Sequence, residues 1–239
     1  MIYPKHVALI PDGNRTWAKD NGFPQISGHL EGMNTVVELV KYTFSETPIE
    51  VFTTWGLSTE NLKKRSSDEL EYLFQLYKNF YEKLGLFLKE KNVNFKWAGN
   101  EKGLPKELVD FLRQTEQEYK FGGNKYFVLC INYGGQDEII RGIKKYINNN
   151  SNLSNEELVD KIDEIELTNN LDFAGLPNIE FVIRTKGNMA HRLSGFMSWM
   201  IGYAQLYFVP QKCPEFKTQN YIQALEWFDQ SAEMRNYGK

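Results

Sequence analysis

The chain has 239 residues, of which 41% are hydrophobic, 14% aromatic and 25% charged, and its formal net charge is −3. This length fits one large α/β domain, and the composition is that of a water-soluble protein with enough aromatic residues to line an apolar cavity as well as a core. The negative charge excludes a general attraction for nucleic acid, so an anionic ligand has to be held by locally clustered Arg and Lys.

The start of the chain and its two cysteines indicate a cytoplasmic protein. Lys5 and the first apolar run follow Met1 too closely for the apolar core of a signal peptide. No stretch reaches the roughly 18 to 20 apolar residues that span a bilayer, so any membrane contact has to be peripheral. Cys130 and Cys213 are too few for a disulfide framework, and Cys130 lies in an apolar run where we expect a buried thiol.

Six short apolar runs predict strands, and helical patterns lie between most of them. The runs are residues 6–10, 50–55, 93–98, 126–131, 179–184 and 205–208. This alternation predicts an α/β fold, in which a single domain over residues 1–239 has a central, mostly parallel six-stranded sheet flanked by helices.

Three apolar stripes at helical spacing are expected to belong to the core first and to a cavity wall second. The first consists of Met33, Val36, Val37, Val40 and Phe44. The second belongs to a helix expected to start near Ser66 or Ser67, and it consists of Leu70, Leu73, Phe74, Tyr77, Tyr81, Leu84 and Leu88. The third consists of Phe196, Trp199, Met200 and Tyr203. The polar run 148–152 and the weakly periodic stretch that follows it to Asn178 predict a surface excursion.

The first run ends on Asp12, Gly13 and Asn14, where the chain is expected to turn into a helix. A carboxylate, a glycine that permits close backbone approach and an amide then lie together at the carboxyl end of a strand. Such a group suits Mg²⁺ and phosphate, because a helix start favours negative charge. An N-cap in an ordinary strand-to-helix turn is the alternative.

Polar groups also open the helix predicted between the first and second runs, and others follow the second run. His29 stands at that helix start, where an imidazole can donate to a phosphate oxygen. Segment 56–61 carries small hydroxyls and an amide before the basic run 63–65, and it can orient a substrate and its leaving group. A lone structural histidine and a capped loop beside solvated charges are the alternatives.

A basic cluster follows the fifth run. Segment 183–187 contains Arg184, and segment 191–194 adds Arg192 and Ser194. Two guanidinium groups and a hydroxyl at a strand end make a site for a doubly charged phosphate, because arginine matches phosphate oxygens bidentately. The alternative is that these are solvent-exposed surface charges that bind no ligand.

Taken in chain order, these motifs resemble those of the cis-prenyltransferases, the family that includes undecaprenyl diphosphate synthase, and the resemblance extends over nearly the whole chain. It implies the undecaprenyl diphosphate synthase-like form of the α/β fold. The motifs are His6–Asn14, Gly28–Gly32, Ser58–Asn61, Asn132–Gly135, Ile183–Thr185, His191–Ser194, Tyr203–Phe208 and a closing Arg235–Gly238.

The resemblance implies an Mg²⁺-dependent enzyme that extends an allylic diphosphate, such as farnesyl diphosphate, with isopentenyl diphosphate in cis condensations and releases pyrophosphate. Asp12 resembles the essential aspartate that handles Mg²⁺ and assists pyrophosphate departure, and Asn61 resembles the residue proposed to help remove the proton. Metal roles are implied for Asp12, His191 and Gln205. Substrate-binding roles are implied for Gly13, Asn14, Arg15, Thr16, Trp17, Gln25, His29, Ser58, Thr59, Glu60, Leu62, Arg65, Arg184, Arg192, Leu193 and Ser194.

Within this set, the allylic diphosphate is assigned to Gly13, Asn14, Arg15 and His29, and the isopentenyl diphosphate to Arg184, Arg192 and Ser194. Several positions depart from the family pattern. Thr16 and Gln25 stand where arginines are usual, so weaker or altered allylic binding is our hypothesis. Gln205 replaces a glutamate, and a neutral amide ligates Mg²⁺ less strongly than a carboxylate does.

Other departures concern the loops and the cavity. Leu62 replaces a usual tryptophan, and one extra residue leaves Lys64 or Arg65 in the family's arginine role, of which we favour Arg65. The 185–191 loop carries two extra residues and places Asn188 near a usual glutamate. Phe127 falls where a smaller residue lies near the deep end of the product tunnel, so we predict that its bulk shortens the product.

The resemblance also implies a homodimer, in which the C-terminal tail completes a neighbouring site. A peripheral membrane contact for product release is compatible with the sequence. Two alternatives stay open: a non-catalytic or regulatory partner subunit of the same fold, which the lost charges favour and Asp12 opposes, and a short-chain or irregular prenyl diphosphate synthase.

Overall fold

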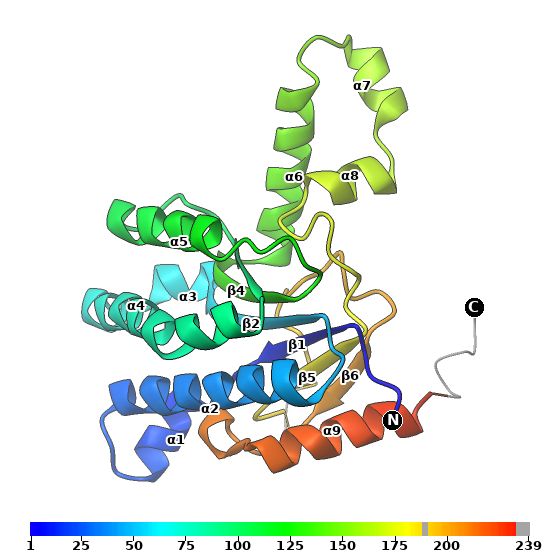
Figure 1. The fold of residues 1–239 in the computed structure, drawn as a ribbon. Coiled ribbons are helices and arrows are strands. Elements are labelled where there is room, and N and C mark those ends of the chain that lie inside the picture. The colour runs from blue at the N-terminus through cyan, green and yellow to red at the C-terminus, as the bar shows by residue number, and fades with distance from the viewer. Residues whose placement is uncertain (188–190, 233–239) are drawn as a thin grey trace.

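The computed structural model describes residues 1–187 and 191–232, and its centre is a six-stranded sheet (Figure 1). The strand order is β3-β4-β2-β1-β5-β6, and all neighbouring strands pair in parallel. The strands are β1 (His6–Ile10), β2 (Val51–Ser58), β3 (Asn94–Ala98), β4 (Tyr126–Tyr133), β5 (Phe181–Arg184) and β6 (Gln205–Phe208). The six predicted strands are confirmed, in a sheet that is wholly parallel.

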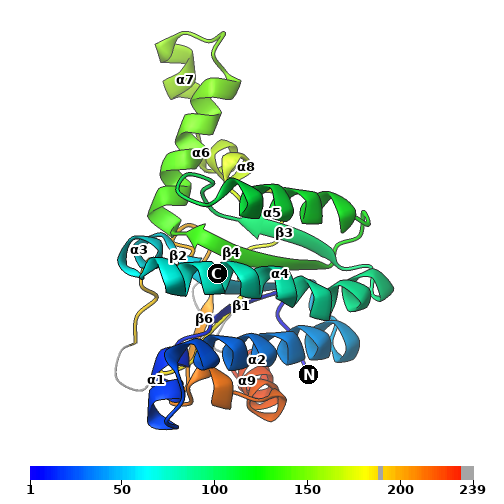
Figure 2. The ribbon, with the colours of Figure 1, turned by 90° about the vertical axis from the view of Figure 1, so that its left-hand side faces the viewer.

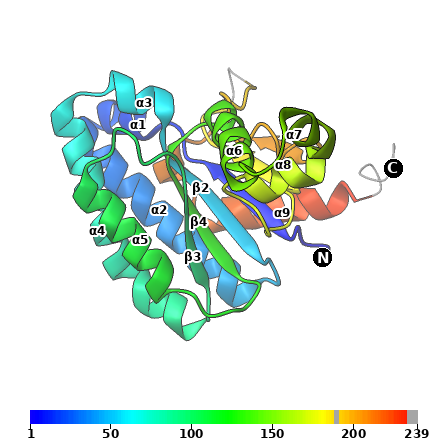
Figure 3. The same cartoon turned by 90° about the horizontal axis from the view of Figure 1, so that it is seen from above.

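Helices cover both faces of this sheet in a single α/β domain. Seen from above, α2, α4 and α5 lie on one side of the strands and α6 and α8 on the other (Figure 3). The helices are α1 (Asn14–Asp20), α2 (Gln25–Glu46), α3 (Thr59–Lys64), α4 (Ser67–Glu90), α5 (Lys106–Glu118), α6 (Gly135–Asn149), α7 (Asn155–Lys161), α8 (Glu164–Asn170) and α9 (Thr218–Gln230), with the 3-10 turn η1 at Cys213–Glu215. Because both faces are covered, β1 is a continuous buried run rather than an alternating one.

The larger hydrophobic core lies between the sheet and helices α2, α4, α5 and α9. The whole predicted stripe of α2 is buried in it, and so are four residues of the α4 stripe, Leu73, Tyr77, Leu84 and Leu88. Helix α4 begins at Ser67 because the Ser66 side chain caps it, accepting from the Glu69 backbone N–H at 3.3 Å. The structure therefore confirms the predicted core roles of the α2 stripe and of these four α4 residues, and it confirms the predicted start of α4.

The third apolar stripe does not form the helix that its spacing predicts. Residues 194–203 run as successive turns, with positive φ angles at Ser194, Gly195 and Met197 that interrupt helical geometry. Phe196 and Met197 are fully buried in the smaller core on the opposite face of the sheet, whereas Tyr203 is 89% exposed. The expectation that Tyr203 lies in the core is therefore wrong.

The expected surface excursion after residue 148 is present as a projection. The outer end of α6 and α7 extend away from the body, with α7 at the tip (Figures 1 and 2). The segment is nevertheless helical in part, because Ser154 and Glu157 form a capping box that starts α7.

Some predictions fall on residues outside the described part of the chain, namely Asn188 and the Arg235–Gly238 tail. Cys130 and Cys213 are both buried free thiols, which confirms the expectation for Cys130. Within residues 1–187 and 191–232, no helix is long and apolar enough to cross a membrane.

Candidate active site

Three adjacent strands bring polar residues to the carboxyl edge of the sheet. Arg184 ends β5, Asp12 follows β1, and Ser58 ends β2, and β1 lies between the other two strands. Parallel strands present their carboxyl ends at one edge, where open α/β sheets bind ligands. Asp12 and Arg184, 172 positions apart in the chain, therefore meet.

Arg184 is the buried centre of this edge, with a side chain only 8% exposed. Its Nη2 donates to Asp12 Oδ2 at 2.9 Å, and its Nη1 donates to Ser194 Oγ at 3.0 Å and to the Arg192 carbonyl. Asp12 Oδ1 accepts from the Gly13 backbone N–H at 2.7 Å. Asp12 remains 40% exposed, so its carboxylate keeps lone pairs for a ligand beside a fixed guanidinium fork.

Two glycines allow this corner to form. Gly13 has φ of 97°, in the left-handed region, and a Cβ there would lie 2.8 Å from Lys212 Cβ. Gly32 of α2 packs against Asn14, where a Cβ would lie 2.3 Å from Asn14 Oδ1. Helix α2 therefore approaches closely enough to hold the Asn14 amide at the cavity wall.

A cavity of about 350 Å³ opens from this edge, within the roughly 300–1,000 Å³ typical of small-molecule sites. One end is polar, and from there the lining continues along α2 and α4 with apolar side chains. The polar lining includes Asp12, Asn14, His29, Ser58, Glu60, Asn61, Arg65, Arg184 and Ser194, and the apolar lining includes Met33, Val36, Leu73, Leu76, Phe80 and Leu129. The shape suits a ligand with an anionic head and an apolar tail.

Phe80 is the lining residue farthest along α4. Its ring lies 5.5 Å from that of Phe127 on β4, which in turn lies 6.0 Å from Phe95 on β3. Phe127 is fully buried and is absent from the cavity lining, so it supports the Phe80 ring from behind.

His29 and Arg65 converge on one carboxylate at the polar end. Glu69 Oε1 lies 2.9 Å from His29 Nε2 and 3.5 Å from Arg65 Nη1, which ties α2 to the start of α4. Burial, and secondarily the Arg65 charge, lowers the pKa of His29. Lys64 instead pairs with Glu60 at 2.5 Å on the surface, so Arg65 is the one of the two basic residues that faces the cavity.

The segment after β2 is both a capped loop and part of the site. Ser58 Oγ accepts from the Asn61 backbone N–H at 3.0 Å and starts α3, while Asn61 lines the cavity. Thr59 and Leu62 lie outside the lining: Thr59 packs on Gly134, and Leu62 packs on the larger core.

Several buried polar atoms in the described residues lack a hydrogen-bond partner, and most belong to residues that line the cavity. These are Asn14 Oδ1, Thr54 Oγ1, Arg65 Nε, Tyr77 Oη and Arg184 Nε. Because buried polar groups are normally paired, this set indicates donors and acceptors available to a ligand. Sequence reasoning missed Thr54, and it gave Tyr77 only a core or wall role, because a hydroxyl within an apolar pattern carries no signal of the cavity it faces.

Other predicted substrate-binding residues lie outside the cavity lining. Arg15 donates to Gln25 at 3.0 Å, and Thr16 accepts from Lys186. The Trp17 ring packs on Phe23, with ring centroids 5.8 Å apart. Of the cluster after β5, the exposed Arg192 contributes its carbonyl, and Leu193 packs on the smaller core.

Gln205 does not share a metal site with Asp12 within one chain. It is the first residue of β6 and pairs with Phe181 at the amino end of β5, whereas Arg184 and Phe208 pair at the carboxyl end. Three residues of strand separate the two ends by about 10 Å, so this metal assignment is wrong for a single chain. His191 stacks on Phe208, with ring centroids 4.9 Å apart, and so lies toward the carboxyl edge.

Asp12 fits Mg²⁺ as a partner of substrate phosphate. In residues 1–187 and 191–232, no three His, Cys, Asp or Glu side chains gather as a metal site. Mg²⁺ is commonly bound through one or two carboxylates together with phosphate oxygens and water, rather than in an all-protein cage. A partly exposed carboxylate beside Arg184 and Ser194 matches that mode.

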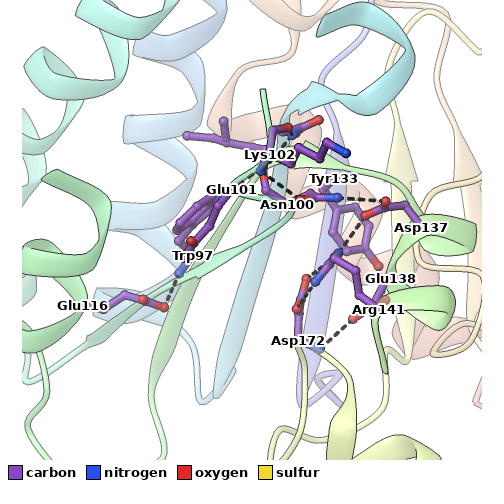
Figure 4. A network of polar contacts seen from close by, with 12 residues as sticks. Trp97, Asn100, Glu101, Lys102, Glu116, Tyr133, Asp137, Glu138, Arg141 and Asp172 are labelled. Atoms are coloured by element: carbon purple, nitrogen blue, oxygen red, sulfur yellow. Dashed lines mark hydrogen bonds and ion pairs between the residues drawn. The ribbon is translucent and has the colours of Figure 1, made fainter. Parts of the chain in front are cut away.

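A buried polar network braces the wall behind the site (Figure 4). The Tyr133 hydroxyl donates to Glu138 at 2.5 Å, and the Asp172 backbone N–H donates to the other Glu138 oxygen at 3.0 Å. Arg141 holds Asp172 through two hydrogen bonds of 2.6 and 2.7 Å. The Tyr133 carbonyl accepts from the indole of Trp55, a cavity residue, so the network positions one wall.

The parallel α/β fold and this polar-to-apolar cavity suit an enzyme that acts on an amphipathic anionic substrate. The sequence model of the undecaprenyl diphosphate synthase family matches residues 10–238. The chain belongs to this family of cis-prenyltransferases, and it is a prenyl transferase.

Individual relatives agree over nearly the full length. An isoprenyl transferase of Treponema denticola is 36% identical over 234 residues, which cover 98% of this chain and 97% of that protein. The farnesyl-diphosphate-specific ditrans,polycis-undecaprenyl-diphosphate synthase of Coxiella burnetii is 30% identical, over 95% of this chain and 93% of that protein. The crystal structure of lavandulyl diphosphate synthase from Lavandula x intermedia, in complex with dimethylallyl diphosphate, superposes with a TM-score of 0.84 at 28% identity, covering 95% of both chains.

Proposed function

We propose that this enzyme condenses isopentenyl diphosphate with an allylic diphosphate, of which farnesyl diphosphate is the first candidate, and releases pyrophosphate with the help of Mg²⁺. The observation that carries the proposal is the Asp12–Arg184–Ser194 corner at the polar end of an apolar cavity. The corner suits diphosphate groups, and the cavity suits a prenyl chain.

The chain's own residues account for the polar steps. In the reaction the allylic carbon–oxygen bond breaks, a carbon–carbon bond to the isopentenyl unit forms, and that unit loses a proton. Asp12 and Arg184 hold the phosphate groups in place, Asn61 at the cavity wall is assigned to orienting the proton-removal step, and the departing pyrophosphate accepts the proton. Mg²⁺ bound at Asp12 would neutralise charge that develops on the departing pyrophosphate.

A short product is the second candidate outcome. The apolar lining ends at Phe80, which Phe127 supports from behind, and the cavity measures about 350 Å³. The structural neighbour from Lavandula is named as a lavandulyl diphosphate synthase, and its structure contains dimethylallyl diphosphate. A one-condensation or irregular coupling enzyme would need no deeper space than this.

We also propose a cytoplasmic homodimer that contacts the membrane only peripherally, for product release. Exposed apolar side chains lie on the α6–α8 projection, on the 194–203 turns and on the edge strand β6, and a second copy could cover one of these surfaces. They are Ile140, Ile147, Val159, Ile165, Tyr203 and Leu206. Sedimentation of the purified protein measures its oligomeric state, and Tyr203→Glu should shift a dimer toward monomer.

The activity is tested by incubating purified protein with Mg²⁺, labelled isopentenyl diphosphate and either geranyl or farnesyl diphosphate, followed by mass analysis of the products. Asp12→Asn, which keeps the side-chain size, should lose activity, and the exposed Asp68→Asn should retain it. Folded wild-type protein that forms no product from any allylic starter would refute the proposal and favour the partner-subunit alternative.

A further inference from the structure

Lys186 places its ammonium group against α1, next in the chain to the Asp12–Arg184–Ser194 corner. Its Nζ donates to Thr16 Oγ1 at 2.7 Å, across 170 positions of sequence. The neighbouring Thr185 hydroxyl donates to the Asp12 carbonyl at 2.7 Å, and Arg184 binds the Asp12 carboxylate. These contacts close a ring that runs from Asp12 through the first turn of α1 to Thr16, across to Lys186 and back through Arg184.

Lys186 has an unusual backbone conformation, and its charge takes part in none of the ion pairs among the described residues. Its φ of 54° lies in the left-handed region, which costs energy for a residue other than glycine and is concentrated at functional sites. Its backbone N–H donates to the Gln211 carbonyl at 2.7 Å, which holds the turn in place. None of the ion pairs among the described residues involves Lys186, whereas Lys212 bridges Asp20 at 3.0 Å and Glu215 at 3.3 Å.

We propose that Lys186 is a substrate-positioning residue that binds the diphosphate of the allylic substrate at the α1 side of the corner. The inference rests on the proposed function and names a residue for it. A lysine is a point charge on a flexible stem, so it can follow a phosphate group that enters or leaves. Thr16 holds the ammonium against the first turn of α1, the helix that follows Asp12, and the cation of that turn, Arg15, is bound to Gln25.

Lys186→Asn removes the charge, and asparagine tolerates the left-handed backbone better than most residues do. We expect the KM for the allylic diphosphate to rise about five- to tenfold, the scale of one ordinary net hydrogen bond, while the KM for isopentenyl diphosphate stays within about twofold. Lys186→Arg should retain most of the affinity. Lys19→Gln, which removes an exposed cation from α1, the helix that Lys186 contacts, is the matched control and should change neither KM.

Rescue separates substrate contact from loop architecture. Thr16→Arg in the Lys186→Asn background should restore affinity, because a guanidinium at position 16 starts next to the space that the lysine ammonium occupies. The salt dependence of the allylic KM should also become shallower in Lys186→Asn and recover with Thr16→Arg. A purely structural role for Lys186 would produce neither change.

The decisive measurement is calorimetric titration of wild type, Lys186→Asn and Lys19→Gln with inorganic pyrophosphate in metal-free buffer, beside product analysis of the same proteins. Loss of pyrophosphate affinity in Lys186→Asn alone supports the inference. Equal affinity in all three proteins, or no pyrophosphate binding by wild type, overturns it. The product assay tests the proposed function separately. If wild type forms product and Lys186→Asn binds pyrophosphate as well as wild type does, only the role of Lys186 is rejected. If pyrophosphate binding depends on Lys186 but no product forms, only the proposed reaction is rejected.

Discussion

Glu138→Gln tests how the buried network behind the site responds to pH. Burial, with a smaller contribution from Asp172, raises the pKa of Glu138 from 4.5 to about 7 in the folded protein. Between these values the folded chain binds a proton that the unfolded chain has released, so the free energy of unfolding falls as pH rises. The difference corresponds to about 3 kcal/mol at roughly 1.4 kcal/mol per pKa unit. This stability is present below pH 4.5 and lost above about pH 7.

Glutamine keeps the shape of the side chain but does not ionise. Between pH 5 and pH 8, which contains most of this change, the free energy of unfolding of the variant should therefore fall by about 2.5 kcal/mol less than that of wild type. One of the hydrogen bonds from Tyr133 and Asp172 is lost, which costs about 1 kcal/mol at both pH values. Urea unfolding of wild type and Glu138→Gln at pH 5 and pH 8 measures these free energies of unfolding. Glu101→Gln, which removes a surface ion pair with Arg113, is the control. Equal pH dependence in wild type and Glu138→Gln would refute the reasoning.

Three further predictions concern the site itself. Arg184→Lys should lower kcat/KM about 10- to 100-fold, because one ammonium cannot replace the guanidinium fork that contacts Asp12; steady-state kinetics with near-wild-type activity would contradict this. Phe80→Ala should lengthen the product and destabilise the fold by about 3 kcal/mol, whereas Phe127→Ala should lengthen it less; unchanged product masses in both variants would show that these rings do not limit chain length. Gly32→Ala should raise the substrate KM at least fivefold, since its Cβ would lie 2.3 Å from Asn14 Oδ1, and an unaltered KM would show that the Asn14 amide is not needed.

The predictions from local pattern that held are those that depend on near neighbours in the chain. Continuous apolar runs mark strands that are covered on both faces, and Ser66 before an amphipathic stretch marks a helix start. The same logic placed Asp12 and Arg184 at strand ends, because a run of apolar residues stops where the strand leaves the core. The sequence of 194–203 misled because its apolar spacing is helical while its backbone angles are not.

By itself, the sequence determined the fold class, the strands, the family and the polar groups that follow strands β1, β2 and β5. Only the tertiary structure decided which of these groups meet. The order of strands in the sheet is set by long-range packing, and it brings Asp12 to Arg184 while leaving Gln205 at the opposite end of its strand. The cavity likewise depends on how α2 and α4 pack over the sheet. The neighbours of a side chain such as Tyr77 in the folded chain decide whether it fills the core or lines the cavity, and the sequence does not specify those neighbours.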